Sequence, residues 1–276
     1  MEGRLSDPIG NEIQSFPRYS WKKEFEQAAR CGFDLIEWVF DLYENNPILD
    51  NVGVNEIKNL SQKHGIYVNA VCADYFMKKM LFNVSDFELE RNLTVLRRLI
   101  EKCRVLDIKI LEIPLVDDSS LKSKNDEEQL IHNLEKILPV AKENGVELTL
   151  ETDLPTHSFK ELLEKFNHPN IKANYDTGNS TALGYNIKEE LEVLKSWITN
   201  VHIKDRIYKG KSVPLGTGNT DFETFFSILA KINYNGSLII QGAREINNNV
   251  ISPEFTCKKY LEFVKQYVDK YFTISS

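Results

Sequence analysis

The sequence lacks the cysteine patterns that mark redox motifs, zinc ribbons or disulfide scaffolds. It has four cysteines, and no two of them form a CxxC pair. In a chain of this length, isolated cysteines are usually buried and behave as small hydrophobic side chains. We therefore expect Cys31, Cys72, Cys103 and Cys257 to be free thiols in a reducing compartment, without disulfides or metal ligation.

Long apolar runs, targeting signals and excess positive charge are also missing. No stretch approaches the ~18 apolar residues of a membrane span, and residues Met1–Leu5 lack the apolar core of a signal peptide. We therefore expect a cytoplasmic protein with no membrane partner. The formal net charge is −7, which argues against a nucleic-acid partner because non-specific binding to phosphate needs clustered basic residues.

A Gly-rich phosphate loop after the first strand, typical of an open doubly wound sheet, is absent as well. Instead, short runs rich in Val, Ile and Leu alternate with helical segments, which predicts strands buried on both faces of a parallel sheet. A chain of 276 residues suits one (β/α)₈ TIM barrel of the α/β class. We expect a single domain over residues 1–276, closed by a short eighth strand near Met1–Leu5. The seven runs are Asp34–Trp38, Tyr67–Cys72, Lys109–Ile113, Val146–Glu151, Ile171–Tyr175, Ile198–His202 and Ser237–Gln241.

Several segments carry signals for the starts of helices. Ser85-Asp-Phe-Glu88 is a capping box, in which the first and last side chains each bond a backbone N–H of the first turn. Thr220-Asp-Phe-Glu223 has the same pattern. Apolar spacing predicts one helix over Gln129–Asn144. Ser252-Pro253 predicts the start of a final helix that runs to about Tyr271.

Polar side chains end four consecutive predicted strands: Glu151, Asp176, His202 and Gln241. Barrel strands point their carboxyl ends at the active-site face, so these side chains should meet at one rim. Each alone is more often a helix cap or a structural hydrogen-bonding group. Several such groups at one rim are costly to bury unless they share a function. Carboxylate, imidazole and amide ligands suit Mn²⁺, Mg²⁺, Co²⁺ or Zn²⁺.

Other polar residues near the strand ends are candidates for binding the hydroxyl or phosphate groups of a substrate. The alternatives are a helix cap, a surface ion pair or a structural turn. Gly216-Thr-Gly218 offers backbone N–H groups for a phosphate at a helix start, and a plain loop is the alternative. The candidate side chains are Glu37, Glu112, Asn179, Asp205 and Arg206.

At these positions the sequence resembles the sugar phosphate isomerase/epimerase superfamily, the xylose isomerase-like TIM barrels. Within it, the chain is similar to the branch of L-ribulose-5-phosphate 3-epimerases and hexulose-6-phosphate isomerases. The most specific matches are Asn174-Tyr-Asp-Thr-Gly-Asn179 and Val201-His-Ile-Lys-Asp-Arg206. The resemblance covers nearly the whole chain. It implies a small-molecule sugar or sugar phosphate as partner and, because such barrels are often dimers or tetramers, a homo-oligomer.

The resemblance also implies roles for the strand-end residues. Glu151, Asp176, His202 and the residue at 241 would hold a divalent metal. Glu151 would be the main catalytic base of an isomerase or epimerase that acts through an enediolate. The family normally has Glu where this chain has Gln241. An amide binds a metal through its oxygen but cannot exchange a proton at neutral pH.

This departure separates two reactions. Epimerisation ordinarily needs proton-transferring groups on both faces of the substrate, whereas aldose–ketose isomerisation can use Glu151 alone. We therefore expect isomerase activity to exceed 3-epimerase activity, unless a water or Glu245 replaces the missing carboxylate. Two alternatives stay open at this point. One is a catalytically impaired, sugar-binding relative, which Gln241 motivates. The other is an endonuclease IV-like DNA-repair enzyme, against which the acidic charge argues.

Overall fold

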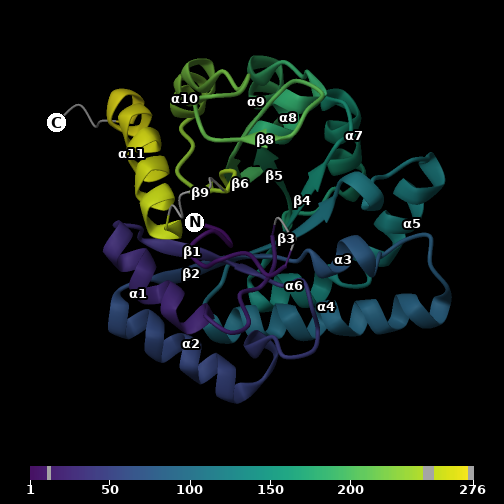
Figure 1. Cartoon of the computed structure of the whole chain (residues 1–276). Coiled ribbons are helices and arrows are strands. Elements are labelled where there is room, and N and C mark those ends of the chain that lie inside the picture. The colour runs from purple at the N-terminus through teal and green to yellow at the C-terminus, as the bar shows by residue number, and fades with distance from the viewer. Residues whose placement is uncertain (11–13, 245–251, 273–276) are drawn as a thin grey trace.

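A parallel sheet curls into a nearly closed barrel at the centre of the molecule (Figure 1). The computed structural model describes residues 1–10, 14–244 and 252–272. Neighbouring strands pair in parallel in the order β1-β2-β3-β4-β5-β6-β9, and each matches one of the seven apolar runs within two residues. The strands are β1 (Leu35–Val39), β2 (Tyr67–Cys72), β3 (Ile110–Leu115), β4 (Glu147–Thr152), β5 (Ile171–Asp176), β6 (Ile198–Ile203) and β9 (Ser237–Ile240).

The first residues of the chain bridge the gap between β9 and β1. Glu2 forms an isolated parallel bridge with Glu37 of β1. The Glu2 N–H also donates to the carbonyl of Ile240 at 3.3 Å, and the Glu37 N–H donates to the carbonyl of Met1 at 3.0 Å. The predicted eighth strand thus appears in the structure as a single bridge at the expected end of the chain, and it completes the ring.

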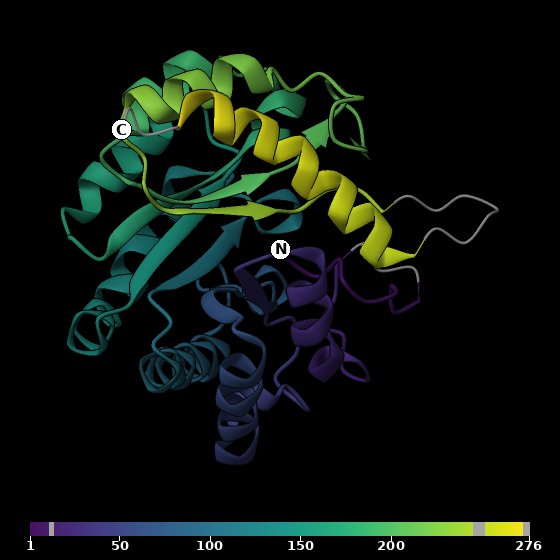
Figure 2. The same cartoon turned by 90° about the vertical axis from the view of Figure 1, so that its left-hand side faces the viewer.

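The larger helices surround the barrel as a ring of packed neighbours. They contact one another in the order α1, α2, α4, α6, α5, α7, α9, α10 and α11, and α11 returns to α1. Figures 1 and 2 show α11 lying along the outside of the barrel. None of the helices in the described ranges is long and apolar enough to cross a membrane. The helices are α1 (Trp21–Cys31), α2 (Asn51–His64), α3 (Tyr75–Lys78), α4 (Asp86–Leu106), α5 (Lys124–Glu135), α6 (Leu138–Asn144), α7 (Thr156–Phe166), α8 (Thr177–Leu183), α9 (Ile187–Leu194), α10 (Phe222–Lys231) and α11 (Pro253–Tyr271), with short 3-10 turns η1 (Pro47–Leu49) and η2 (Asp117–Ser119).

Of the four predicted helix signals, two are confirmed and two are wrong. Ser85 and Glu88 form the capping box of α4, and Ser252 caps α11. The single helix predicted over Gln129–Asn144 is wrong: α5 and α6 are separate because Pro139 has no N–H to continue the hydrogen-bond ladder. The second capping box is also wrong, since α10 begins one residue later and Asp221 accepts from the Thr224 N–H.

The hydrophobic core lies between the strands and the helices, whereas the barrel interior is polar. All four cysteines are free and buried, as predicted. Inside the barrel, burying carboxylates costs free energy unless they are paired or hydrogen-bonded. A polar interior of this kind therefore indicates a functional site at the barrel mouth. Its buried side chains include Glu2, Glu37, Glu112, Thr149, Asn174, Asn200 and His202.

Candidate active site

The four predicted metal ligands lie at the carboxyl ends of four neighbouring strands. Asp176, the last residue of β5, is paired directly with His202 of β6. Gln241 follows β9, and its backbone N–H donates to the carbonyl of Ile203 at 2.9 Å. Glu151 lies near the end of β4. None of the four is on the opposite face, and ligand atoms of Glu151 and His202 lie within 4.8 Å of each other. The convergence of all four side chains on one ion stays a prediction.

His202 lies at the centre of this rim and is fully buried. Its Nε2 atom is 2.8 Å from Glu37 Oε2 and 3.1 Å from Glu112 Oε2, and its Nδ1 atom is 3.5 Å from Glu151 Oε2. Burial opposes the charged ring, but the Glu112 and Glu37 carboxylates outweigh it and raise the pKa of His202 well above its usual value. A cation that binds this imidazole must therefore compete with a proton.

Glu112 was expected at the rim as a substrate-binding side chain, and the structure places it deeper. β3 continues past it to Leu115, so its carboxylate points into the barrel against His202 and only 1% of the residue is exposed. Burial raises the pKa of Glu112 well above its usual value. Glu37 is buried in the same way and also accepts from the Asn200 amide at 3.0 Å. Both carboxylates lie against the histidine.

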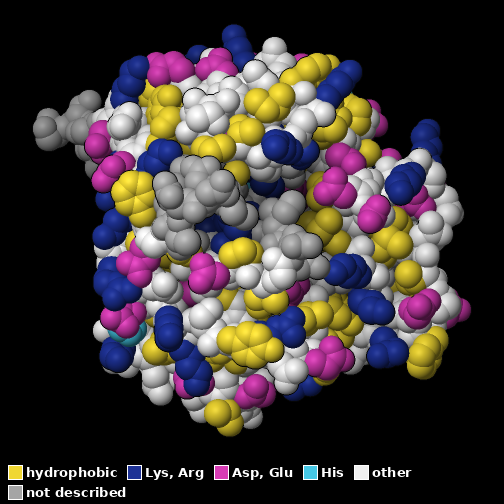
Figure 3. Space-filling model, viewed as in Figure 1, with side chains coloured by type: hydrophobic (Ala, Val, Ile, Leu, Met, Phe, Trp, Pro, Cys, Tyr) yellow, Lys and Arg dark blue, Asp and Glu magenta, His cyan; other side chains and the backbone are white. Residues whose placement is uncertain are grey.

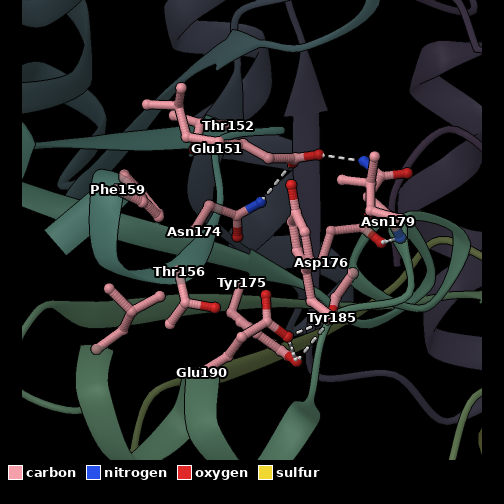
Figure 4. Close-up of a pocket in the computed structure, with 14 residues that line it drawn as sticks. Glu151, Thr152, Thr156, Phe159, Asn174, Tyr175, Asp176, Asn179, Tyr185 and Glu190 are labelled. Atoms are coloured by element: carbon pink, nitrogen blue, oxygen red, sulfur yellow. Dashed lines mark hydrogen bonds between the residues drawn. The ribbon is translucent and has the colours of Figure 1, made fainter.

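Glu151, the predicted base, is held by two amides. Figure 4 shows Asn174 of β5 and Asn179 of α8 pointing at its carboxylate. Asn174 Nδ2 donates to Oε2 at 2.8 Å, and Asn179 Nδ2 donates to Oε1. Arg206 in turn donates to Asn179 Oδ1 at 2.8 Å. Asn179 and Arg206, both expected to bind substrate, therefore form a chain that ends on Glu151 and fixes its orientation.

Asp176 already has partners for both of its oxygen atoms. Oδ1 caps α8 by accepting from the N–H groups of Gly178 and Asn179, each at 2.8 Å. Oδ2 is 3.1 Å from the Lys204 ammonium. Burial lowers the pKa of Lys204, but the Asp176 and Glu151 carboxylates more than compensate and raise it. A metal bound by Asp176 would share Oδ2 with this lysine or displace it.

Asp205 was expected to contact the substrate, but in the structure its carboxylate accepts hydrogen bonds from backbone N–H groups of a nearby loop. Oδ2 accepts from the N–H groups of Gly216 and Gly218 at 2.9 and 2.8 Å, and Oδ1 accepts from Thr220 at 3.1 Å. These bonds order the loop that follows the β7 (Asp205–Arg206) and β8 (Ser212–Val213) hairpin. The backbone groups expected to hold a phosphate at Gly216 and Gly218 are thus occupied within the chain.

Two residues that the sequence reasoning missed lie beside Gln241. Its Nε2 atom donates to Glu2 Oε2 at 2.7 Å and to Gln14 Oε1 at 3.0 Å. Burial, followed by the Glu37 carboxylate, raises the pKa of Glu2 to about 7. A run of five residues is too short to show strand periodicity, so no sequence signal identified Glu2. Glu245, considered as a substitute for the missing carboxylate, lies outside the described residues.

The donor set fits a divalent cation. Ligand atoms of Glu112, Glu151 and His202 all lie within 4.8 Å of one another. In the described part of the chain, His202 Nδ1 and Gln241 Oε1 are buried and make no hydrogen bond. Since buried polar atoms are normally satisfied, each of these atoms is available to a ligand. Oxygen and imidazole donors suit Mn²⁺, Mg²⁺, Co²⁺ or Zn²⁺.

A pocket adjoins this site. It opens between β4, β5 and the helices α7, α8 and α9, and Figure 4 shows Glu151 and Asp176 at one side and Glu190 at the other. The face of the molecule seen in Figure 3 mixes basic, acidic and hydrophobic side chains. Glu151 is thus one of the residues that line the pocket, and the remaining lining includes Thr152, Thr156, Phe159, Tyr175, Ser180 and Tyr185.

Two curated relatives match most of the chain. SgbU of Haemophilus influenzae is 25% identical over an alignment 275 residues long, and this alignment includes 92% of this chain and 94% of that protein. The L-ribulose-5-phosphate 3-epimerase UlaE of Shigella flexneri is 24% identical over 247 residues, which cover 85% of this chain and 86% of the relative.

Solved structures share the fold at lower identity. The IOLI protein with a binding zinc atom has a TM-score of 0.77 at 19% identity and covers 92% of this chain and 94% of its own. D-psicose 3-epimerase of Clostridium cellulolyticum, solved with D-tagatose, has a TM-score of 0.75 at 18% identity, with coverages of 90% and 93%. A Mycobacterium smegmatis barrel in complex with magnesium has a TM-score of 0.72 at 17% identity, with coverages of 99% and 95%.

A family model described as "Xylose isomerase-like TIM barrel" matches residues 25–267, which span every strand from β1 to β9 and the residues that line the rim. The match agrees with the parallel barrel, with the order of its strands and with the resemblance seen in the sequence. The chain therefore belongs to the xylose isomerase-like TIM barrel family.

Proposed function

We propose that this chain is a divalent-metal-dependent isomerase or epimerase of a sugar or sugar phosphate. The observation that carries the proposal is the arrangement at His202. Glu37 accepts the hydrogen bond of Nε2, while Nδ1 is buried, unpartnered and 3.5 Å from Glu151 Oε2. A carboxylate that binds one ring nitrogen orients the other toward a metal, as second-shell partners of metal-binding histidines commonly do.

The residues at the rim suit proton transfer next to a carbonyl group. Glu151 is fixed by two amide donors, and its remaining lone pairs can accept a proton from the substrate carbon beside the carbonyl. Arg206 stabilises this geometry through Asn179. Glu151, Asp176, His202 and Gln241 would hold the cation, which when bound supplies Lewis-acid polarisation of the sugar carbonyl and hydroxyl, so that an enediolate can form.

The relatives point to the class of reaction and of substrate. UlaE is named as an L-ribulose-5-phosphate 3-epimerase and a structural neighbour as a D-psicose 3-epimerase, and the chain is accordingly an isomerase-type enzyme. We propose ketoses and ketose 5-phosphates as substrates. A homo-oligomeric state and a cytoplasmic location stay predictions from the sequence.

The test is turnover on a panel of ketopentoses, ketohexoses and their phosphates, with Mn²⁺, Mg²⁺, Co²⁺ and Zn²⁺ added in turn. We expect product with at least one sugar and one metal, and loss of that product with Glu151→Gln. No turnover on any combination, by a protein that binds the metals, would contradict the proposal.

One alternative is favoured by a specific observation. The Lys204 ammonium pairs with Asp176, and an amide stands at position 241, so among the four proposed ligands one carboxylate is already paired with a cation and one position is neutral. A sugar-binding protein without catalysis would fit this charge. It would bind ketoses in calorimetry and show no solvent deuterium in the recovered sugar.

A further inference from the structure

The side chain of Gln241 is held in one orientation by its neighbours. Its Nε2 atom donates to Glu2 Oε2 at 2.7 Å and to Gln14 Oε1 at 3.0 Å. Its Oε1 atom is buried and has no hydrogen-bond partner within the described ranges. The two ends of this amide are therefore in different situations: the nitrogen is saturated, and the oxygen is free.

The chemistry of the neighbours fixes which end is which. The Glu2 carboxylate, when ionised, can only accept hydrogen bonds, so the amide nitrogen of Gln241 must face it. Gln14 is fixed by the same logic, because its Nε2 atom donates to Glu2 Oε1 at 2.6 Å and to Asp74 Oδ2 at 2.8 Å. Gln14 must then offer its own oxygen to Gln241. Two carboxylates thus determine the orientation of both amides.

Glu2 also lies within reach of the imidazole at the centre of the site. It occupies the gap between β9 and β1, and its ligand atom lies within 4.8 Å of those of Glu37 and His202. In the strand order, this gap is four positions from β4, which carries Glu151. Glu2 therefore places a buried carboxylate on the side of the barrel opposite Glu151.

We propose that Glu2 and Gln241 work as a pair, in which Gln241 offers its carbonyl oxygen to the cation while Glu2 supplies the negative charge and holds the amide in place. Glu2 is thus a positioning residue. This inference rests on the proposed metal-dependent function. The amide at position 241 is then a functional ligand. Its oxygen binds the cation, and the adjacent Glu2 carboxylate supplies the negative charge.

Exchanging the charged and the neutral side chain between positions 2 and 241 tests whether the two residues act as a pair. Three variants are compared with the wild type: Glu2→Gln, Gln241→Glu, and the double variant. Mn²⁺ affinity is measured by calorimetry, and Tm is measured after chelator treatment. We expect Glu2→Gln to weaken Mn²⁺ binding at least ~10-fold, as loss of an outer-shell partner does. Gln241→Glu should lower the Tm of the chelated protein, since it sets two buried carboxylates against each other. The double variant should recover most of both losses.

A matched control separates the pair from general burial effects. Glu24 on α1 is likewise a buried carboxyl whose pKa burial raises to about 7, and Glu24→Gln should leave Mn²⁺ affinity unchanged. Wild-type Mn²⁺ affinity in Glu2→Gln, with additive Tm changes in the double variant, would overturn the pairing. If neither the wild type nor Asp176→Ala binds Mn²⁺, the proposed metal-dependent function is contradicted. The Tm values of the two single variants and the double variant still decide whether the side chains of Glu2 and Gln241 are coupled.

Discussion

His202 Nε2 lies 2.8 Å from Glu37 Oε2, and neither side chain is exposed to solvent. The two residues are 165 positions apart in the chain, so barrel closure alone brings them together. This bond selects the ring nitrogen that carries hydrogen in the neutral imidazole, and it leaves Nδ1 turned toward Glu151.

The first prediction concerns this bond. Glu37→Gln keeps the shape of the side chain but removes the anionic acceptor that orients the imidazole. We expect Mn²⁺ affinity to fall by at least ~10-fold, the lower end for loss of an outer-shell partner. Calorimetric titration of the variant beside Glu24→Gln provides the measurement and its control. Equal affinity in both variants would show that Glu37 does not act through His202.

The second prediction concerns the ligands themselves. Asp176→Ala and His202→Ala each remove a strong donor from the rim, so each should weaken metal binding by at least ~10-fold. Elemental analysis after equilibrium dialysis reports the metal content of each variant. Because Asp176 also caps α8, Asp176→Asn serves as a second variant that keeps the cap. Wild-type stoichiometry in all of these proteins would remove both residues from the ligand set.

The third prediction concerns the reaction preference. With an amide at position 241, Glu151 is the base on one face, and we expect isomerisation to exceed C3 epimerisation in the wild type. By residue chemistry alone, Gln241→Glu would raise epimerisation by adding a second proton-transferring group, and would raise metal affinity by adding a negative charge. Since Glu2 lies 2.7 Å from this amide, we expect the gain in epimerisation in the Glu2→Gln/Gln241→Glu double variant, whose metal affinity should stay close to that of the wild type.

Solvent deuterium at C3 of the recovered sugar measures this difference. An added general acid–base group contributes on the order of 10²-fold or more, so the double variant should exchange C3 faster by about that factor. Rapid C3 exchange with inversion in the wild type, as the names of the relatives suggest for those proteins, would show that a second base already acts.

The fourth prediction concerns stability and pH. Glu190 accepts hydrogen bonds from Tyr175 and Ser180, and burial raises its pKa from 4.5 to about 7. Between pH 4.5 and about 7, Glu190 therefore keeps its proton in the folded state and loses it in the unfolded state. The stability that this proton contributes is present below pH 4.5 and is lost as pH rises through about 7. The whole effect is on the order of 3 kcal/mol.

Glu190→Gln should remove this part of the pH dependence. Urea unfolding at pH 5 and pH 8 should show a smaller loss of stability in the variant than in the wild type. Glu192→Gln, at an exposed position on α9, is the control and should keep the wild-type slope. Identical slopes in all three proteins would mean that Glu190 is already ionised in the fold at pH 5.

The sequence by itself determined the barrel and the rim. Runs of Val, Ile and Leu mark the strands because a parallel sheet is buried on both faces, and a polar residue that ends such a run must lie at the carboxyl end of its strand. The positions of Glu151, Asp176, His202 and Gln241 at that rim could therefore be predicted from spacing and residue type. The helix caps at Ser85 and Ser252 were equally local, since each depends on a bond to a residue three positions away.

Only the tertiary structure decided what these side chains touch. Gln241 and Glu2 are 239 positions apart, and no periodicity in the sequence relates them. Asp205, whose motif suggested substrate binding, instead satisfies loop N–H groups, because the nearest backbone donors compete successfully for a buried carboxylate. Residue type and strand position determine where in the barrel a polar side chain lies. Its hydrogen-bond partners depend on how the ring of strands closes, and that is a property of the whole chain.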